Sequence, residues 1–459
     1  MSLDIKIIND IKEIVGEQNC LTSLEDRRCY SYDARTDGAI PDLVVFPSSA
    51  KEVSAILILA NRHLFPVIPR GQGTGLTGGS IPIKGGVVIS FTRMNRILEI
   101  DTKNLIAVVE PGVITFELQQ EVAKYGLFYP PDPASYKYSS IGGNVGECAG
   151  GPNSLKYGVT RDYVLGLEVV QPTGEIINTG VKTMKGVVGY DLTRLFVGSE
   201  GTLGVITKII LKLIPLPESK ATILALFQEV EDAAEAVSAI IAAKIVPSTM
   251  EFMDKASIKC SEQANPMGLP EGIGGLLLIE VDGDKESIKV QAEKVKKIVF
   301  EKKAIQCNVT EDPKEADRLW QARRTLSQAT YNLNPVKIAE DVVVPRSNIP
   351  VLIRALEEME KRFGIPILSF GHAGDGNFHV SIMIKDTPED RAKAEEAVKA
   401  IFEETIRLGG TLSGEHGIGT SKSAYIGMEL SPEVITTMKK IKKLFDPNNI
   451  LNPGKIFPE

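Results

Sequence analysis

The chain has 459 residues, of which 43% are hydrophobic, and its formal net charge is -7. This length exceeds that of one ordinary domain, so we expect two domains with a large buried core. The charges are spread along the chain without basic blocks, which excludes a protein that binds nucleic acid through its phosphates.

The N-terminal end and the most apolar stretch bear on export and membrane insertion. Residues 1–13 alternate apolar and charged side chains, which predicts an amphipathic helix in place of a secretory signal. Residues 55–69 are interrupted by Arg62, His63 and prolines, whereas a membrane helix needs about 20 apolar residues. We expect a cytoplasmic protein without a transmembrane segment and leave peripheral contact with a membrane open.

The five cysteines are odd in number, widely spaced and free of any Cys-x-x-Cys pair. A reduced protein fits this pattern best. The spacing also argues against an intrinsic iron-sulfur cluster, which needs a close group of cysteine thiolates. If the chain is a redox enzyme, its electrons leave through another protein or a diffusible acceptor.

The first part of the chain predicts a capped helix, a short strand and a glycine-rich loop. Ser49 and Glu52 form a capping box, and the apolar spacing that follows predicts a helix that ends near His63. Strands are expected at residues 66–69, 86–90 and 105–110. The glycine-rich loop, residues 70–79, therefore joins strand to strand.

The loop glycines Gly73, Gly75 and Gly78 satisfy the G-x-G-x-x-G pattern of a dinucleotide-binding Rossmann unit. That motif requires a helix to open at the last glycine, but the β-branched residues after the loop predict a strand. This argues against the Rossmann version and against an NAD enzyme. Two interpretations remain: a flexible surface turn, or a nest of backbone N–H groups that binds a phosphate. A second glycine-rich stretch, residues 139–151, favours the nest, because a large planar cofactor needs two backbone walls.

The sequence pattern after residue 164 predicts that the arrangement of strands and helices changes along the chain. Residues 164–179 predict a strand, a turn and a strand, and residues 201–213 predict a long strand. Pro215 and Pro217 mark the expected domain boundary. Beyond them, helices are expected at residues 230–244, 285–302, 314–332, 350–363 and 388–408, and strands at 276–281, 338–344, 365–370 and 378–384. These elements predict an α+β domain whose sheet is covered by helices on one side.

Three of the four histidines lie in two glycine-rich segments near the C-terminus. His372 and His379 have opposite parity along a strand, so they share a face only if the turn at residues 374–376 folds the segment back. With Glu415 they form a candidate site of two nitrogens and one oxygen for zinc, manganese or iron, and His416 is the next residue. The alternative is that each histidine caps a turn or satisfies hydrogen bonds in a core.

Six segments together resemble the FAD-dependent 2-hydroxy-acid dehydrogenases of the vanillyl-alcohol-oxidase and p-cresol-methylhydroxylase (VAO/PCMH) fold. They are PRGQGTG from Pro69, SIGGN from Ser140, GSEGTLG from Gly198, GHAGDGNFH from Gly371, SGEHG from Ser413 and NPGK from Asn452. The family includes D-lactate dehydrogenase, the catalytic subunit of glycolate oxidase and D-2-hydroxyglutarate dehydrogenase. The resemblance implies a VAO/PCMH-type FAD-binding domain at residues 1–217, an α+β substrate (cap) domain at 218–410, and a C-terminal segment at 411–459 that returns to the first domain.

The resemblance also assigns roles to single residues. Those implied to neighbour the FAD are Arg70, Gly71, Gly73, Thr74, Gly75, Gly142, Asn144, Glu200, Gly204 and Lys455. The first loop lacks the histidine or cysteine to which covalent relatives attach the flavin, so we expect non-covalent FAD. Arg323 and Ser327, one helical turn apart, are implied to hold the substrate carboxylate, with Lys337 as a further residue on the substrate side.

The activity that the resemblance implies is oxidation of a small D-2-hydroxy acid, with D-lactate to pyruvate as the first choice. A divalent metal on His372, His379 and Glu415 would acidify the hydroxyl, and His416 would accept its proton. Arg323 would orient the carboxylate for hydride transfer to flavin N5. Glycolate and D-2-hydroxyglutarate are the alternatives. Ser381 disfavours the latter, because the hydroxyglutarate enzymes resemble one another in having an asparagine there.

Relatives imply an electron-transferring flavoprotein as the electron acceptor, with iron-sulfur subunits or quinone as the alternative. A homo-oligomer is left open. A non-catalytic flavin or metal carrier on the same fold is a second class of hypothesis, which the presence of Arg323, Glu415 and His416 disfavours.

Overall fold

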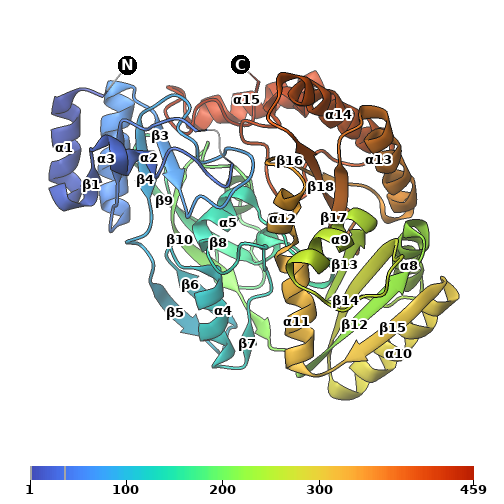
Figure 1. Ribbon diagram of the computed structural model, residues 1–459. Coiled ribbons are helices and arrows are strands. Elements are labelled where there is room, and N and C mark those ends of the chain that lie inside the picture. The colour runs from blue at the N-terminus through green and yellow to red at the C-terminus, as the bar shows by residue number, and fades with distance from the viewer. Residues whose placement is uncertain (1–2, 36–37, 459) are drawn as a thin grey trace. The chain divides into compact units, whose positions relative to one another are not determined.

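The structure is a computed structural model that describes residues 3–35 and 38–458 (Figure 1). The chain divides into two compact units. The first unit contains Met1–Gly150, Val159–Leu216 and Glu415–Glu459, and the second contains Gly151–Gly158 and Pro217–Gly414. The chain leaves the first unit between the two prolines, Pro215 and Pro217.

The first unit opens with a sheet of four strands in the order β1-β2-β4-β3. The strands are β1 (Cys20–Leu21), β2 (Leu43–Val45), β3 (Val67–Arg70) and β4 (Val87–Ser90). Helix α3 (Ala50–His63) begins where the Ser49 hydroxyl accepts a hydrogen bond from the Glu52 amide at 3.3 Å, as the capping box predicts. The glycine-rich loop leads from β3 to β4, which run parallel, so it joins strand to strand as predicted.

A second sheet of the first unit has five antiparallel strands in the order β5-β6-β10-β8-β9. They are β5 (Ile97–Asp101), β6 (Ile106–Val109), β8 (Val164–Val170), β9 (Ile176–Gly180) and β10 (Val205–Lys212). The sequence pattern predicts these strands except β5. The second glycine-rich stretch, predicted only as a backbone wall, forms a short helix, α5 (Ile141–Glu147), capped by Ser140.

Five further helices and two short strands belong to the first unit. The helices are α1 (Ile5–Val15), α2 (Leu24–Arg28), α4 (Thr115–Ala123), α7 (Leu192–Phe196) and α15 (Pro432–Phe445). The strands β7 (Leu127–Phe128) and β11 (Ile214–Pro215) pair with each other. Helix α1 is the predicted N-terminal helix, and it buries Ile11 and Val15 in the same core as α3.

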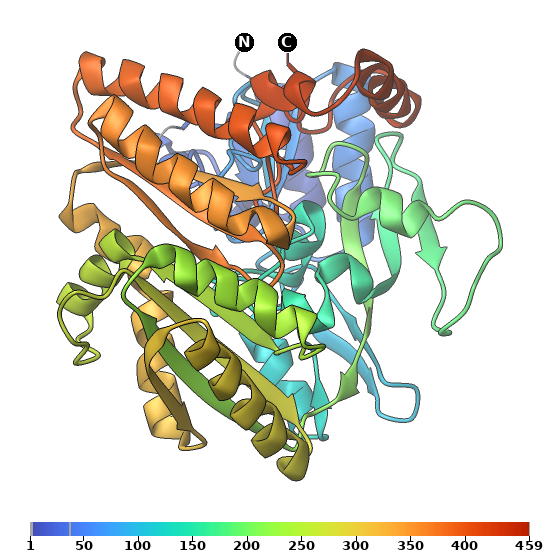
Figure 2. The ribbon, with the colours of Figure 1, turned by 90° about the vertical axis from the view of Figure 1, so that its right-hand side faces the viewer.

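The second unit is built on a seven-stranded antiparallel sheet in the order β15-β12-β14-β13-β17-β18-β16. The strands are β12 (Ser219–Phe227), β13 (Thr249–Asp254), β14 (Gly275–Gly283), β15 (Ala304–Thr310), β16 (Val336–Val343), β17 (Ile367–His372) and β18 (Asn377–Ile384). Four helices lie side by side across one face (Figure 2), namely α14 (Pro388–Arg407), α13 (Ile349–Phe363), α8 (Val230–Ala242) and α10 (Lys285–Glu301).

The opposite face of this sheet is also covered. Leu226, Leu278 and Phe370 share an apolar core with residues of three further helices. These helices are α9 (Lys255–Ala264), α11 (Pro313–Arg324) and α12 (Leu326–Ala329). The α+β class is confirmed, but the expectation of helices on one side only is wrong. The strands β12 and β14 are apolar at successive positions and therefore need cover on both faces.

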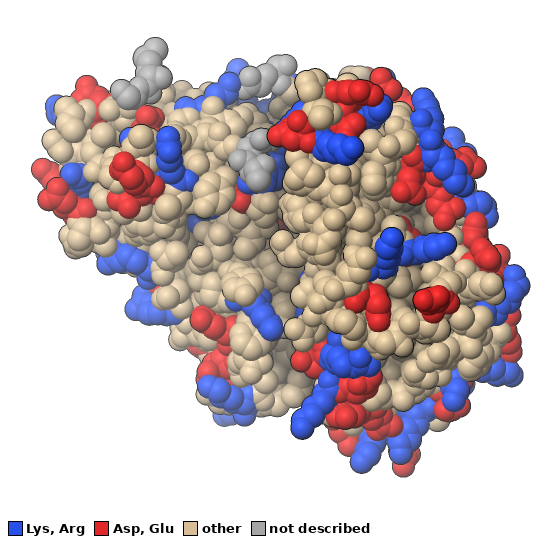
Figure 3. Space-filling view, viewed as in Figure 1, with Lys and Arg blue, Asp and Glu red and all other residues tan. Residues whose placement is uncertain are grey.

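None of the described helices has both the length and the apolar character needed to cross a bilayer. On the face shown in Figure 3, lysine and arginine side chains are interspersed with aspartate and glutamate. That face shows no continuous basic patch of the kind that tracks nucleic-acid phosphates.

Candidate active site

A cavity in the first unit is walled by both glycine-rich segments. Its lining includes residues 69–76, 79 and 80 of the loop, residues 140, 142–144, 146, 147 and 149 of the second stretch, and residues 200, 201, 204 and 206. Glu415 and His416 also line it. The residues predicted to neighbour FAD therefore surround one cavity, except Lys455, which is not among the described lining residues.

The walls of the cavity approach each other so closely that side chains are excluded at several glycines. A Cβ on Gly71 would lie 2.5 Å from Ser140 Oγ, and a Cβ on Gly142 would lie 2.5 Å from the Pro111 Cβ. Gly73 has a φ of 69°, a left-handed conformation that glycine adopts readily. The residues present thus fit a planar, phosphate-bearing cofactor, because they offer backbone surface and leave room for it.

The side chains of Arg70 and Lys455 donate hydrogen bonds to residues that directly follow the glycine-rich loop. Arg70 is buried and its Nη1 donates to Ser80 Oγ at 3.0 Å, so the guanidinium folds back over its own loop. Lys455 Nζ donates to the Ile81 carbonyl at 2.6 Å, and burial lowers the pKa of Lys455 to about 8. For Lys455 the structure thus gives a contact with Ile81, just after the loop, and contact with FAD stays a prediction.

Glu200 connects the cavity wall to the segment that follows His416. Its carboxylate accepts hydrogen bonds from the amides of Ile418 and Gly419 at 2.8 and 2.7 Å. Thr77 Oγ1 donates to the His416 carbonyl at 3.0 Å. The loop and the Glu200 turn therefore fix the backbone of His416 at the cavity.

The second unit brings His372 and His379 together on one hairpin. The two residues lie at the end of β17 and in β18, and His379 is paired with Phe370, two residues before His372. Both imidazoles thus point to the same face, with their Nε2 atoms 3.4 Å apart. This confirms that the glycine turn between the strands overcomes the opposite parity.

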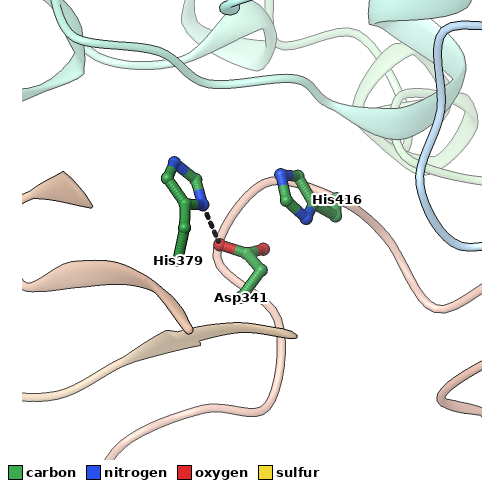
Figure 4. A group of neighbouring side chains, drawn as sticks. All are labelled: Asp341, His379 and His416. Carbon is green, nitrogen blue, oxygen red and sulfur yellow. Dashed lines mark ion pairs between the residues drawn. The ribbon is translucent and has the colours of Figure 1, made fainter. Parts of the chain in front are cut away.

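Each of these histidines has a carboxylate at its other ring nitrogen. His372 Nδ1 lies 2.5 Å from Glu251 Oε1, and His379 Nδ1 lies 3.7 Å from Asp341 Oδ1. Figure 4 shows the His379 imidazole turned toward the Asp341 carboxylate. Sequence reasoning missed both acids. The available signal was a carboxylate between the apolar residues Met250 and Phe252 of strand β13, where Glu251 is fully buried.

Glu251 also holds Arg323. The Arg323 Nη2 atom lies 2.6 Å from Glu251 Oε2, and both side chains are buried. Burial acts to raise the pKa of Glu251, but Arg323 and His372 outweigh it and bring the pKa down to about 2. Glu251 is therefore a carboxylate at any physiological pH, and it holds two predicted site residues at once.

Ser327 and Lys337 form a second polar pair. Lys337 Nζ donates to the Ser327 hydroxyl at 2.9 Å and to its carbonyl at 2.8 Å, and burial lowers the pKa of Lys337 to about 8. The predicted helix at residues 314–332 is interrupted at Thr325, so Arg323 and Ser327 belong to successive short helices. The exposed Arg324 pairs with Asp317 and belongs to the surface.

The two groups of residues are linked along the chain. The amide of Gly414 donates to Asp341 Oδ2 at 2.9 Å, within the second unit. Glu415 is the next residue, and it begins the segment that lines the cavity of the first unit. A trans peptide places consecutive Cα atoms about 3.8 Å apart, so the chain itself ties Glu415 to the end of β16.

The fold and the cavity define an FAD-binding oxidoreductase. A family model described as the C-terminal domain of FAD linked oxidases matches residues 216–456, and one described as an FAD binding domain matches residues 41–180. The chain belongs to the FAD-linked oxidases. Among solved structures it resembles p-cresol methylhydroxylase, with a TM-score of 0.81 and 18% identity over 98% of this chain and 96% of the other. This confirms the VAO/PCMH-type fold.

Curated relatives match over nearly their whole length. The chain is 48% identical to the glycolate oxidase subunit GlcD of Bacillus subtilis, over 98% of this chain and 97% of the relative. It is 39% identical to the D-lactate dehydrogenase of Anaerostipes hadrus, with the same coverage of 98% and 97%.

Proposed function

We propose that the chain oxidises a small 2-hydroxy acid with FAD held non-covalently in the cavity of the first unit, and that D-lactate is the first candidate substrate. The observation that carries the proposal is that Glu415 and His416 line the cavity formed by the two glycine-rich segments. The names of the relatives support this class of substrate, glycolate for one and D-lactate for another.

The chemistry that FAD supplies when bound is acceptance of a hydride. The residues of the chain must then orient the hydroxy acid and remove its hydroxyl proton. His416 is the proposed base, because an imidazole nitrogen can accept a proton. Thr77 binds the His416 carbonyl, and Glu200 binds the Ile418 amide two residues later.

Arg323, Ser327 and Lys337 are proposed to bind the substrate carboxylate. Arg323 has donors beyond those facing Glu251, and its Nε has no hydrogen-bond partner among the described residues. Lys337 carries a charge while it is protonated, and it holds the Ser327 hydroxyl at 2.9 Å. Bidentate pairing with a guanidinium would fix the orientation of the carboxylate.

A divalent ion, zinc, iron or manganese, is proposed on His372, His379 and Glu415. The donor set supports this, because the two Nε2 atoms are 3.4 Å apart and each Nδ1 faces a carboxylate. Ligating histidines usually have such a partner at the second nitrogen. The chemistry that a divalent ion supplies there is polarisation of a substrate oxygen. The chain would deliver Glu415 from its position directly after Gly414.

An anaerobic titration tests the proposal. The purified protein is expected to show flavin absorption that D-lactate bleaches and NADH does not, and metal analysis of the same sample is expected to find one divalent ion per chain. Failure of every small 2-hydroxy acid to bleach the flavin would refute the proposed activity. Full bleaching by protein without any bound metal would refute the metal site alone.

Glycolate is the second candidate substrate, because the relative named for glycolate oxidase shares 48% identity. D-2-hydroxyglutarate is the third. The same titration with each acid ranks them by the bleaching rate. An electron-transferring flavoprotein is the proposed acceptor, with iron-sulfur subunits or quinone as the alternative. The five free cysteines support a reducing location such as the cytoplasm.

A further inference from the structure

Glu147 has a carboxyl group at the cavity and takes no part in the proposed oxidation of the hydroxy acid. It is the last residue of α5 and lines the cavity near Glu200. Its Oε2 is enclosed and has no hydrogen-bond partner among the described residues. A buried polar atom without a partner is rare in folded proteins, and a bound group that supplies the partner is one of its physical explanations.

The backbone around Glu147 keeps its carboxyl group in place. A Cβ on Gly79 would lie 2.6 Å from Glu147 Oε1, and a Cβ on Gly417 would lie 2.2 Å from Glu147 Oε2. The carboxyl group is therefore wedged between the glycine-rich loop and the residue that follows His416. Side chains at these two glycines would displace it.

The neighbouring charges distinguish Glu147 from Glu200. Glu200 accepts two backbone amides, and Lys455 and Lys422 favour its ionised form against the burial that raises its pKa. Among the described residues, neither a backbone amide nor a lysine gives Glu147 such support. Burial, followed by the negative charges of Glu200 and Asp33, raises the pKa of Glu147 well above its usual range. Of the two acids, Glu147 is therefore the one whose surroundings favour the protonated form more strongly.

A protonated carboxyl group is a hydrogen-bond donor, and a buried donor is costly until it finds an acceptor. The cofactor that binds this cavity carries ring carbonyls and ring nitrogens that accept hydrogen bonds. Glu147 contacts the glycine next to His416, so it lies at the end of the cavity where the reacting ring must be if His416 acts as proposed.

We propose that Glu147 is an uncharged carboxylic acid that donates a hydrogen bond to an acceptor atom of the bound FAD ring. The placement at the ring, rather than elsewhere on FAD, rests on the proposed role of His416. FAD binding and the protonation state of Glu147 can both be measured even if no hydroxy acid proves to be a substrate.

Two substitutions separate a neutral donor from a charged acceptor. Glu147→Gln keeps an uncharged donor of similar shape, and its dissociation constant for FAD is expected within about threefold of the wild type. Glu147→Met removes the donor, and one lost hydrogen bond is expected to weaken FAD binding about tenfold. Equal weakening in both variants, or none in Glu147→Met, overturns the proposal. Unfolding of the apo-proteins checks that both variants fold.

Infrared spectroscopy supplies a second measurement that does not depend on Glu147→Met folding. The wild type is expected to show a carbonyl band of a protonated carboxylic acid that shifts when FAD is added and is missing in Glu147→Gln. Glu110 is the matched control, since it is buried in the same unit but ion-paired with Arg96 at 2.7 Å. Glu110→Gln should retain the band. If Glu147→Gln also leaves the band unchanged, Glu147 is ionised and the proposal is wrong.

Discussion

Glu251 contacts two predicted site residues of the second unit, although the sequence pattern does not single it out. It is fully buried and holds Arg323 at 2.6 Å and His372 at 2.5 Å. In Glu251→Gln, the buried guanidinium of Arg323 loses its counter-charge, and breaking such a pair costs about 3–5 kcal/mol. We expect the free energy of unfolding, measured with urea, to fall by about 3 kcal/mol or more.

Glu280 provides the control for this prediction. It lies on β14 in the same sheet and pairs with Lys220 at 3.2 Å, but the Lys220 side chain is 62% exposed. Pairs of this kind contribute at most about 1 kcal/mol. Glu280→Gln should therefore be the milder change, and equal losses in the two variants would contradict the role given to Glu251.

His416 is the residue whose replacement should affect turnover most directly. In His416→Asn the proposed base is gone while Thr77 can still bind the backbone carbonyl, so FAD should remain bound. We expect the rate of flavin reduction by D-lactate to fall about 10²-fold or more. His63→Asn, at the exposed end of α3, should reduce the flavin at the wild-type rate. Near-normal turnover in His416→Asn would remove His416 from the role of base.

Lys337 predicts a pH dependence of substrate binding. Burial lowers its pKa to about 8, so Lys337 loses its proton, and with it the charge that attracts a carboxylate, as the pH rises through that value. The KM for the hydroxy acid should therefore increase above about pH 8 in the wild type. Lys337→Arg stays charged and should show a flat KM over the same range. A wild-type KM that is constant to pH 9.5 would rule out this contribution.

The sequence predicts the site residues that belong to short, unusual motifs and misses those that do not. His372, His379 and His416 lie among glycines, so they attract attention. Glu251 and Asp341 lie inside strands, where ordinary β-pattern rules read them as solvent-facing positions. Only the pairing of β13 with β17 and of β16 with β18 reveals that they face the histidines.

At the scale of elements, the glycines of α5 differ in how closely other residues pack against them. Gly142 is packed against Pro111, whose Cβ and carbonyl oxygen would be 2.5 and 2.8 Å from an added Cβ. Apart from the adjacent residues and the backbone of α5 itself, no atom of the described residues lies within 4 Å of a Cβ added to Gly146. Gly142→Ala should lower the free energy of unfolding by about 1–3 kcal/mol through overpacking. Gly146→Ala should raise that of the apo-protein by up to about 1 kcal/mol, because alanine favours the helix.

The same pair tests whether the open space beside Gly146 belongs to the cofactor. Gly146 lines the cavity, so the added methyl group should weaken FAD binding even though the apo-protein becomes more stable. Fluorescence titration with FAD measures this directly. A Gly146→Ala protein that is stabilised and binds FAD as tightly as the wild type would show that the cofactor does not use this wall.

Most elements can be predicted from periodicity, and the failures have physical causes. The helices of the second unit have long amphipathic patterns, and their predicted bounds agree within two residues for α8, α10, α13 and α14. Helix α5 is glycine-rich, so its intrinsic helix propensity is low, and packing against Pro111 and Ser140 decides its conformation. The expectation of cover on one face of the seven-stranded sheet failed for another reason, because it did not use the successive apolar positions of β12 and β14.

At the scale of the whole molecule, the order of segments along the chain differs from their order in space. The first unit is closed by residues 415–459, so the end of the chain supports a loop formed near its beginning. Asn452 makes this connection: its Nδ2 donates to the carbonyls of Gly79 and Glu200, both at 2.7 Å. The resemblance predicts that this segment returns, but the bonds that hold it are visible only in the structure.

Asn452→Asp isolates the contribution of this returning segment. Aspartate has the same shape and tolerates the left-handed backbone of residue 452, whose φ is 41°, but an ionised carboxylate cannot donate to either carbonyl. Each buried acceptor left without a donor costs about 1–3 kcal/mol. The variant should therefore lose at least about 2 kcal/mol of unfolding free energy and should bind FAD more weakly, because Gly79 and Glu200 both line the cavity.

Asn448→Asp is the control, because it alters only an exposed bond to Asn61, and its unfolding free energy should stay within about 0.5 kcal/mol of the wild type. Unchanged FAD affinity in Asn452→Asp would mean that the loop holds the cofactor without help from the C-terminus.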